Sequence, residues 1–89
     1  MLKSVYILTL KYCKDGRLTF KIIDVFDNNL CAMDGLFTEK SRILSINIWN
    51  EAMLNNNVKI ERKQTSITCY MANTENWFTL QIENKEVKE

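Results

Sequence analysis

The chain has 89 residues, a formal net charge of +1 and no histidine. Its length fits one domain, and its nearly balanced charge gives no general affinity for polyanions, so we expect no long nucleic acid as a partner. Without histidine, Ser-His-Asp and Cys-His catalysis and histidine-bearing metal sites are excluded. Both glycines, Gly16 and Gly35, lie outside the spacings of phosphate-binding loops. We therefore expect a protein that is not an enzyme and that holds no cofactor.

The three cysteines, Cys13, Cys31 and Cys69, are odd in number and widely spaced. No two have the CxxC spacing of a zinc site, so we expect no metal and predict small buried apolar residues in a reducing compartment. A small domain without disulfides or a metal often gains stability from a second subunit, which favours a homodimer. The apolar run Val5–Leu10 is too short for a membrane span or a signal peptide, so we expect a cytoplasmic location and no membrane partner.

Asparagine, isoleucine and lysine together supply 28 of the 89 residues, and proline is absent. The codons of these three amino acids are rich in A and T. The bias indicates an AT-rich bacterium, or a phage or mobile element of such a host. It bears on origin and not on chemistry.

Residues 4–26 alternate apolar and polar side chains on either side of Lys14-Asp15-Gly16, which predicts a long β-hairpin. A two-residue Asp15-Gly16 turn would mix apolar and polar residues on each face. A three-residue loop with Gly16 left-handed sets Leu10 opposite Phe20 and gives one apolar face. We prefer this second register, because a one-residue slip moves every side chain to the other face.

In that register the base of the hairpin is apolar on both faces. Its reverse face pairs Ile7 with Ile23 and Val5 with Val25. The mid-chain segment, the second hairpin or a second molecule must cover these four residues. They are therefore our candidate self-interface.

Asp24 is the unusual polar residue of this hairpin, because it falls on the inward face opposite Tyr6. We favour a carboxylate that is hydrogen-bonded at the edge of the sheet, since buried polar groups usually find partners. The alternative is an acid that contacts a ligand at the mouth of a pocket. Further on, Asp34-Gly35 predicts a turn.

The middle of the chain has two interpretations. Residues 44–48 alternate like a strand, whereas Glu51-Ala52-Met53-Leu54 is strongly helix-forming. One interpretation is a single helix from about Ser41 to Asn55, and the other is a strand at 43–49 followed by a short helix capped by Asn50. We favour a helix over most of 41–55, because it could cover a face of the sheet, and we expect Trp49 in the core.

Val58–Glu61 predicts a further strand, followed by a turn or bulge near Arg62–Thr65. Five basic residues could form a patch, but Glu39 and Glu61 interrupt it; they are Lys40, Arg42, Lys59, Arg62 and Lys63. A solvated strand face is the favoured interpretation. Arg62 and Lys63 are the candidate phosphate contacts.

The stretch 67–82 predicts a second hairpin around Asn73–Asn76. Its expected pairs put six apolar residues on one face, namely Ile67, Cys69, Met71, Phe78, Leu80 and Ile82. Phe78 then points into the core and Trp77 points outward, with Tyr70 diagonal to it. Trp77 either packs under a neighbouring element or, with Tyr70, Thr79 and Gln81, forms a surface that binds a partner.

These elements predict an α+β fold: an antiparallel sheet of four or five strands, built from two hairpins, with one helical segment around 41–55. Residues 1–84 form one domain, and 85–89 form a charged tail. We expect a non-catalytic protein that binds a protein partner, as a phage or mobile-element accessory protein inhibiting a host or defence factor would.

Two alternatives stay open at this point. The first is a sponge for a small nucleotide, in which Trp77 or Tyr70 stacks on the base and Arg62 or Lys63 meets phosphate. The second, less favoured, is a small enzyme that uses Asp24 or another carboxylate.

Overall fold

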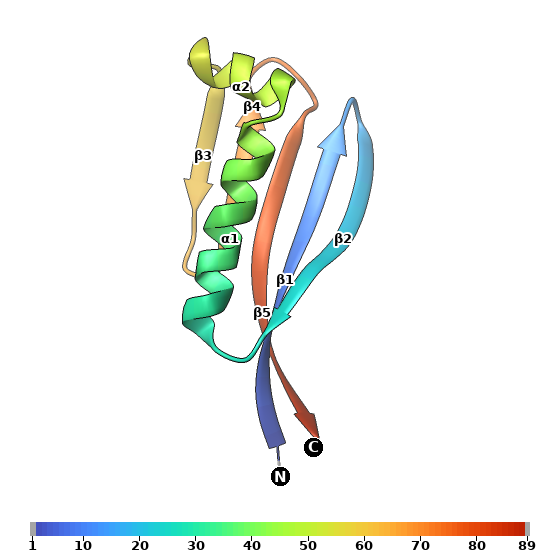
Figure 1. Cartoon of the computed structure of the whole chain (residues 1–89). Coiled ribbons are helices and arrows are strands. Elements are labelled where there is room, and N and C mark those ends of the chain that lie inside the picture. Colours follow the sequence, from blue (N-terminus) through green and yellow to red (C-terminus); the bar gives the residue numbers. More distant parts are fainter. Residues whose placement is uncertain (1, 89) are drawn as a thin grey trace.

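The computed structural model describes residues 2–88, which form one five-stranded antiparallel sheet and two helices (Figure 1). The elements in chain order are β1 (Leu2–Lys14), β2 (Arg17–Phe26), α1 (Asn29–Leu44), α2 (Asn47–Leu54), β3 (Val58–Arg62), β4 (Ser66–Met71) and β5 (Trp77–Lys88). The strand order across the sheet is β2-β1-β5-β4-β3. The predicted α+β class, with an antiparallel sheet built from hairpins, is confirmed.

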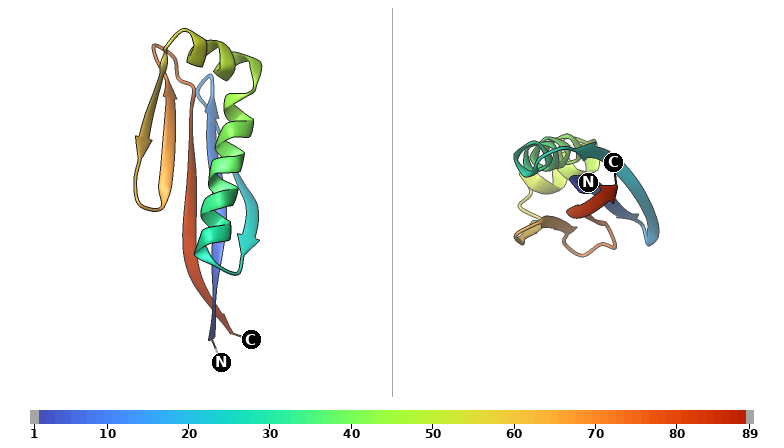
Figure 2. Two further views of the ribbon diagram at one scale, coloured as in Figure 1. Left: turned by 60° about the vertical axis from the view of Figure 1, so that its left-hand side comes forward. Right: turned by 90° about the horizontal axis from the view of Figure 1, so that it is seen from below.

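Both helices lie against the same face of the sheet, which we call the inner face (Figure 2). The opposite, outer face is covered by no other element within residues 2–88. The inner face holds the core, to which β1 contributes Leu8 and Leu10 and β5 contributes Phe78, Leu80 and Ile82. Since side chains alternate along a strand, the residues between these point to the outer face.

The two longest strands, β1 and β5, pair from Leu2↔Lys88 to Cys13↔Trp77. Their free ends leave the body of the domain side by side (Figure 1). Residues 85–88, which we expected in a charged tail, therefore continue β5 and pair with β1. Glu89 lies outside the described residues.

The register of the first hairpin differs from our prediction. Lys14 pairs with Arg17 and Lys11 with Phe20, so the connection is the two-residue Asp15-Gly16 turn. Both turn residues have positive φ, 52° and 82°, as a type I′ turn requires, and this turn matches the twist of the flanking strands. The predicted three-residue loop is wrong, because turn geometry outweighed the separation of apolar from polar residues.

A β-bulge corrects the register near the base of this hairpin. Thr9 pairs with Ile22 but Leu8 pairs with Asp24, so Ile23 is the extra residue of β2. Beyond the bulge Asp24 and Phe26 lie on the inner face. The expected pairs Ile7–Ile23 and Val5–Val25 do not form, and Ile7 pairs with Val25 instead.

Helix α1 lies where we predicted a turn at Asp34-Gly35. Asn28 caps its start, where the side-chain oxygen accepts a hydrogen bond from the Cys31 amide at 2.8 Å. Gly35 is needed inside the helix for contact: a Cβ there would lie 2.6 Å from Cζ of Phe26. The glycine lets the Phe26 ring rest on the helix backbone, so it marks a close approach and not a turn.

The segment 41–55 is helical at both ends but bent in the middle. Helix α1 ends at Leu44 and α2 begins at Asn47, and the Ser45 hydroxyl donates to the Ser41 carbonyl at 2.7 Å at the break. Neither the single helix nor the strand at 43–49 forms. The bend has a packing reason, because it lets Ile43 on α1 and Trp49 on α2 both reach the core.

Trp49 is fully buried, as expected, and it fixes α2 on the sheet. Its indole Nε1–H donates to the Tyr12 hydroxyl at 2.6 Å. Its ring meets Phe78 edge-on with centroids 5.0 Å apart, and Tyr12 stacks on Phe78 at 6.1 Å. Three aromatic residues from α2, β1 and β5 thus close this end of the core.

The second hairpin has the predicted faces but not the predicted pairs. Cys69, Phe78 and Leu80 are buried on the inner face, and Trp77 points to the outer face. Tyr70 pairs with Trp77, two residues from the predicted alignment, because the loop between β4 and β5 is longer than we assumed. The predicted turn after Arg62 is confirmed, and it lets Ile60 share the inner face with Cys69.

The cysteines only partly follow our expectation. Cys13 and Cys69 are buried, whereas Cys31, near the start of α1, is exposed. The prediction is wrong for Cys31, because the helix that carries it was not expected. Burial raises the pKa of the Cys69 thiol to about 11, although the charge of Lys40 acts in the opposite direction.

The Tyr12–Trp49 hydrogen bond can be tested by removing one hydroxyl. Tyr12→Phe leaves the buried Trp49 N–H without its acceptor, so we expect the free energy of unfolding to fall by about 1–3 kcal/mol. Tyr70→Phe removes the same hydroxyl from an exposed ring and should change it by less than about 0.5 kcal/mol. Urea titrations measure both, and equal losses would contradict the assignment.

The raised pKa of Cys69 predicts a pH dependence of stability. Between the ordinary thiol pKa of 9.0 and the folded-state value of about 11, the folded chain keeps a proton that the unfolded chain releases. The contribution of the protonated Cys69 thiol to stability is therefore fully present below pH 9.0, and it is lost as pH rises through about 11. We expect the difference in unfolding free energy between wild type and Cys69→Ala to shrink over this range. Cys31→Ala is the control for loss of an exposed thiol, and a constant Cys69 difference would refute the prediction.

Candidate protein-binding face

The outer face of the sheet is the surface on which most of the predicted site residues gather. One row crosses four strands: Leu18 on β2, Cys13 on β1, Trp77 on β5 and Tyr70 on β4 are successive partners in the register. Cys13 is buried between its neighbours, and Trp77 is half-buried within the row. Tyr70 is exposed. Trp77 and Tyr70 thus lie opposite each other at one end of an uncovered surface.

The centre of the outer face is polar. Thr79 pairs with Thr68, and their hydroxyls are hydrogen-bonded at 2.9 Å. Thr9 donates to the backbone oxygen of Gln81 at 3.4 Å, while the Gln81 side chain is exposed. Of the two predicted polar contacts, Thr79 therefore already has a partner, and the Gln81 amide is presented to solvent.

A stripe of exposed apolar side chains runs along β2 on the outer face, and of its members only Val25 was predicted there. We call this group the β2 stripe: Leu18, Phe20, Ile22 and Val25. The Asp15-Gly16 turn directs the first three to the outer face, and the bulge at Ile23 places Val25 on the same face. We had predicted that the first three point inward. The signal that could have found them was the Asp-Gly dipeptide itself, which favours a two-residue type I′ hairpin.

Three of the four residues predicted as a self-interface lie on the outer face. Ile7 pairs with Val25 of the β2 stripe, and Val5 follows on the same side of β1. Ile23 does not belong with them, and this part of the prediction is wrong. The bulge turns it inward, where it packs against the core.

Asp24 makes a backbone hydrogen bond of the kind that the favoured interpretation expects. Its Oδ1 accepts a hydrogen bond from the Val25 amide at 2.8 Å. It also lines an open groove of about 470 Å³ between β2 and α1, together with Asp34 and Glu39 of the helix. Glu39 is paired with Arg42. Within residues 2–88, no three potential metal ligands gather in one place.

Among the five basic residues of the predicted patch, only Lys59 joins the outer-face aromatics, as the register partner of Tyr70. Arg62 lies on the inner side, with its guanidinium 4.8 Å from the centroid of the Phe37 ring, and Lys40 lies 5.3 Å from the same ring. Lys63 follows β3 in the turn at the far end of β4 from Tyr70. A nucleotide stacked on Trp77 or Tyr70 would therefore be separated from Arg62 by the sheet.

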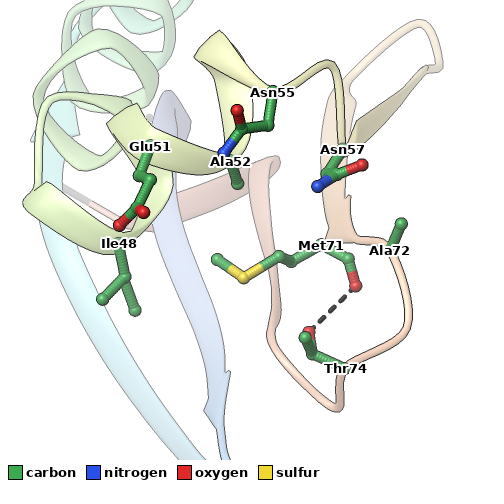
Figure 3. A pocket seen from close by; sticks show the side chains of 8 residues that line it. All are labelled: Ile48, Glu51, Ala52, Asn55, Asn57, Met71, Ala72 and Thr74. Carbon is green, nitrogen blue, oxygen red and sulfur yellow. Dashed lines mark hydrogen bonds between the residues drawn. The ribbon is translucent and has the colours of Figure 1, made fainter.

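A small pocket of about 270 Å³ opens between α2 and the loop that connects β4 to β5 (Figure 3). The Glu51 carboxylate and the Asn55 and Asn57 amides surround an apolar floor that includes Ile48 and Met71. The Thr74 hydroxyl at its rim donates to the Met71 carbonyl at 2.9 Å. The pocket thus offers a single carboxylate among neutral groups, a lining that suggests no particular reaction.

No helix within residues 2–88 has both the length and the apolar character that crossing a membrane requires.

The corrected faces of β2 can be tested with two neighbouring aliphatic residues. Ile23→Ala should lower the free energy of unfolding by about 1–2 kcal/mol, because the side chain is half-buried against the core. Val25→Ala, on the outer face of the same strand, should lower it by less than about 1 kcal/mol. Urea denaturation distinguishes them, and a larger loss for Val25→Ala would reverse the assignment of faces.

Comparisons with protein-family models, with curated proteins and with solved structures gave no match. The function is therefore inferred from the geometry and chemistry of the chain itself.

Proposed function

We propose that this chain is a non-catalytic binding protein that docks a protein partner on the outer face of its sheet. The observation that carries the proposal is the uncovered apolar surface on that face. Leu18, Phe20 and Ile22 are 61%, 60% and 58% exposed. Exposed apolar side chains that are scattered singly are ordinary, but a contiguous group on one face is typical of an interaction site.

The aromatic end of the same face supports a protein partner in particular. Tyr70 is 39% exposed and pairs with Trp77 across β4 and β5. Trp and Tyr contribute most of the binding energy at many protein interfaces, especially when surrounded by groups that exclude water. The neighbouring Thr79 and Gln81 supply a neutral polar surround. The apolar β2 stripe and this aromatic end are joined by the Leu18-to-Tyr70 row.

A nucleotide is the weaker candidate. Its predicted phosphate contact, Arg62, lies on the other side of the sheet from Trp77 and Tyr70. Lys59 shares the outer face with Tyr70, but its charge is already paired with Glu61 at 3.5 Å. A protein partner needs no phosphate-binding cation. The outer face mixes Lys11 and Lys59 with Glu61 and Glu83, so it does not form a dense basic field either.

The kind of partner we propose follows from the composition of the chain. The abundance of asparagine, isoleucine and lysine suggests an AT-rich bacterium as host, with a phage or mobile element as the source. In that setting a small stoichiometric binder would inhibit a protein of the host or of its defence systems. The absence of histidine is consistent with inhibition by occupancy and not by catalysis.

The proposal predicts a specific loss of binding when the aromatic end is changed. The wild-type chain, immobilised, should retain a protein from a lysate of an AT-rich bacterial host, and titration calorimetry with that purified protein should give a stoichiometric complex. Tyr70→Ser and Trp77→Ser should each weaken the complex by at least about tenfold, as loss of an interface aromatic does.

The matched control is Leu54→Ser on α2, which removes a side chain that is 79% exposed but lies off the outer face. It should leave the affinity within about threefold of wild type. If Leu54→Ser weakened binding while both aromatic variants bound normally, the outer face would not be the site. Circular dichroism of each variant excludes a loss of fold as the cause.

A further inference from the structure

We propose that β2 is also the seam of a homodimer, in which a second copy of this chain pairs antiparallel with the unpaired edge of the strand and Phe20 lies at the twofold axis. The proposal goes beyond the binding function described above. Its ligand is the chain itself, and its site is the backbone edge of β2 together with the outer-face side chains of that strand. The mass of the chain in solution tests this dimer whether or not a foreign protein binds.

The edge of β2 has few of the features that normally keep sheet edges from pairing. β2 is an edge strand of the sheet. Its residues Arg17–Ile22 are six consecutive exposed residues, and three of them are large and apolar. The other edge strand, β3, is five residues long and carries the Lys59–Glu61 ion pair at 3.5 Å. Short length and charge protect an edge, whereas a long apolar edge is a template for another strand.

The turn fixes which backbone groups of β2 are free. In a two-residue hairpin the residues that flank the turn, Lys14 and Arg17, form a hydrogen-bonded pair, and every second pair after them does likewise. The backbone groups of Arg17, Thr19 and Lys21 therefore point to β1. Those of Leu18, Phe20 and Ile22 point away from the sheet, and these are the three residues with exposed apolar side chains.

Only one alignment of two such edges satisfies both backbone and side chains. With Phe20 opposite the partner's Phe20, Leu18 faces the partner's Ile22, and each facing pair can exchange both of its backbone hydrogen bonds. Shifting by two residues in one direction brings Lys21 opposite the partner's Lys21. Shifting the other way leaves Ile22 opposite the partner's Gly16 in the turn. The first shift places two like charges opposite each other, and the second leaves the Ile22 side chain without an apolar partner.

The charges on the inner side of the seam are complementary in the same alignment. Lys21 lies opposite the partner's Thr19, so its charge meets a hydroxyl. Arg17 and the partner's Asp24 come to neighbouring positions on the inner face, and the twofold axis repeats the pair at the other end. The bulge at Ile23 bends β2 and ends the seam there. Two β2 stripes then merge into one apolar surface on the outer side of the joined sheet.

The first test is the mass of the full chain in solution, measured by light scattering and sedimentation over concentrations up to millimolar. We expect a dimer of roughly twice the chain mass of 10.5 kDa. Phe20→Lys sets two lysines against each other across the axis and should raise the dissociation constant of the dimer by at least about thirtyfold. Leu30→Lys, at a residue that is 82% exposed on α1, is the control and should leave the dimer intact.

A pair of double variants tests the alignment itself. Leu18→Lys with Ile22→Lys places like charges at both facing pairs and should give a monomer. Leu18→Lys with Ile22→Glu carries the same number of charged residues but opposes unlike charges, so it should restore the dimer. Leu18 and Ile22 are both exposed, so we expect each double variant to fold, and circular dichroism checks this.

A wild-type chain that stays monomeric up to millimolar concentration would overturn the proposal. So would a dimer that survives both Phe20→Lys and the Lys/Lys double variant, since its seam would then lie elsewhere. A monomer for both double variants would overturn the Phe20-centred alignment. None of these results depends on binding of a foreign protein.

Discussion

The hydrogen bond from Trp49 to the Tyr12 hydroxyl, inside a cluster completed by Phe78, is the contact on which the arrangement of the helices depends. It joins α2 to β1 and β5 and closes one end of the core. Trp49 can enter only because the helical segment bends after Leu44, so a local break in helix geometry is stabilised by burial of a large aromatic ring. The sheet is thereby covered on one face.

The outer face follows from a second constraint, the turn at Asp15-Gly16. A type I′ turn sets the register of β2, and that register directs Leu18, Phe20 and Ile22 away from the helices. The chain forgoes the burial of three large apolar side chains in its own core. Both proposals made above arise from this one feature of the register.

The sequence predicted the strands better than their alignments. Alternation identified the faces of β4 and β5, because the apolar residues of both strands, Phe78 and Leu80 among them, fall on one face. It failed for β2, where Leu18, Phe20 and Ile22 alternate as core residues do, but the Asp15-Gly16 turn directs them to the outer face. Helix α1 was missed because Gly35 reads as a turn until Phe26 is known to rest on it. Of the candidate site, Trp77 and Tyr70 were placed correctly on the outward face. Of the β2 stripe only Val25 was, and Ile23 and Arg62 were assigned to surfaces they do not share.

The order of strands also bears on how the chain acquires its fold. β1 lies between β2, its neighbour in sequence, and β5, the last element in the order of the described residues. The hairpin of β1 and β2 can form early, and α1, which follows it directly, contacts its inner face. The second edge of β1 finds its partner, β5, only after all the other elements. Pairing between the two ends of a chain is slow, since a long loop must close first. Until then, an apolar hairpin with two open edges is exposed, and this interval is when association with the wrong neighbour would compete with folding.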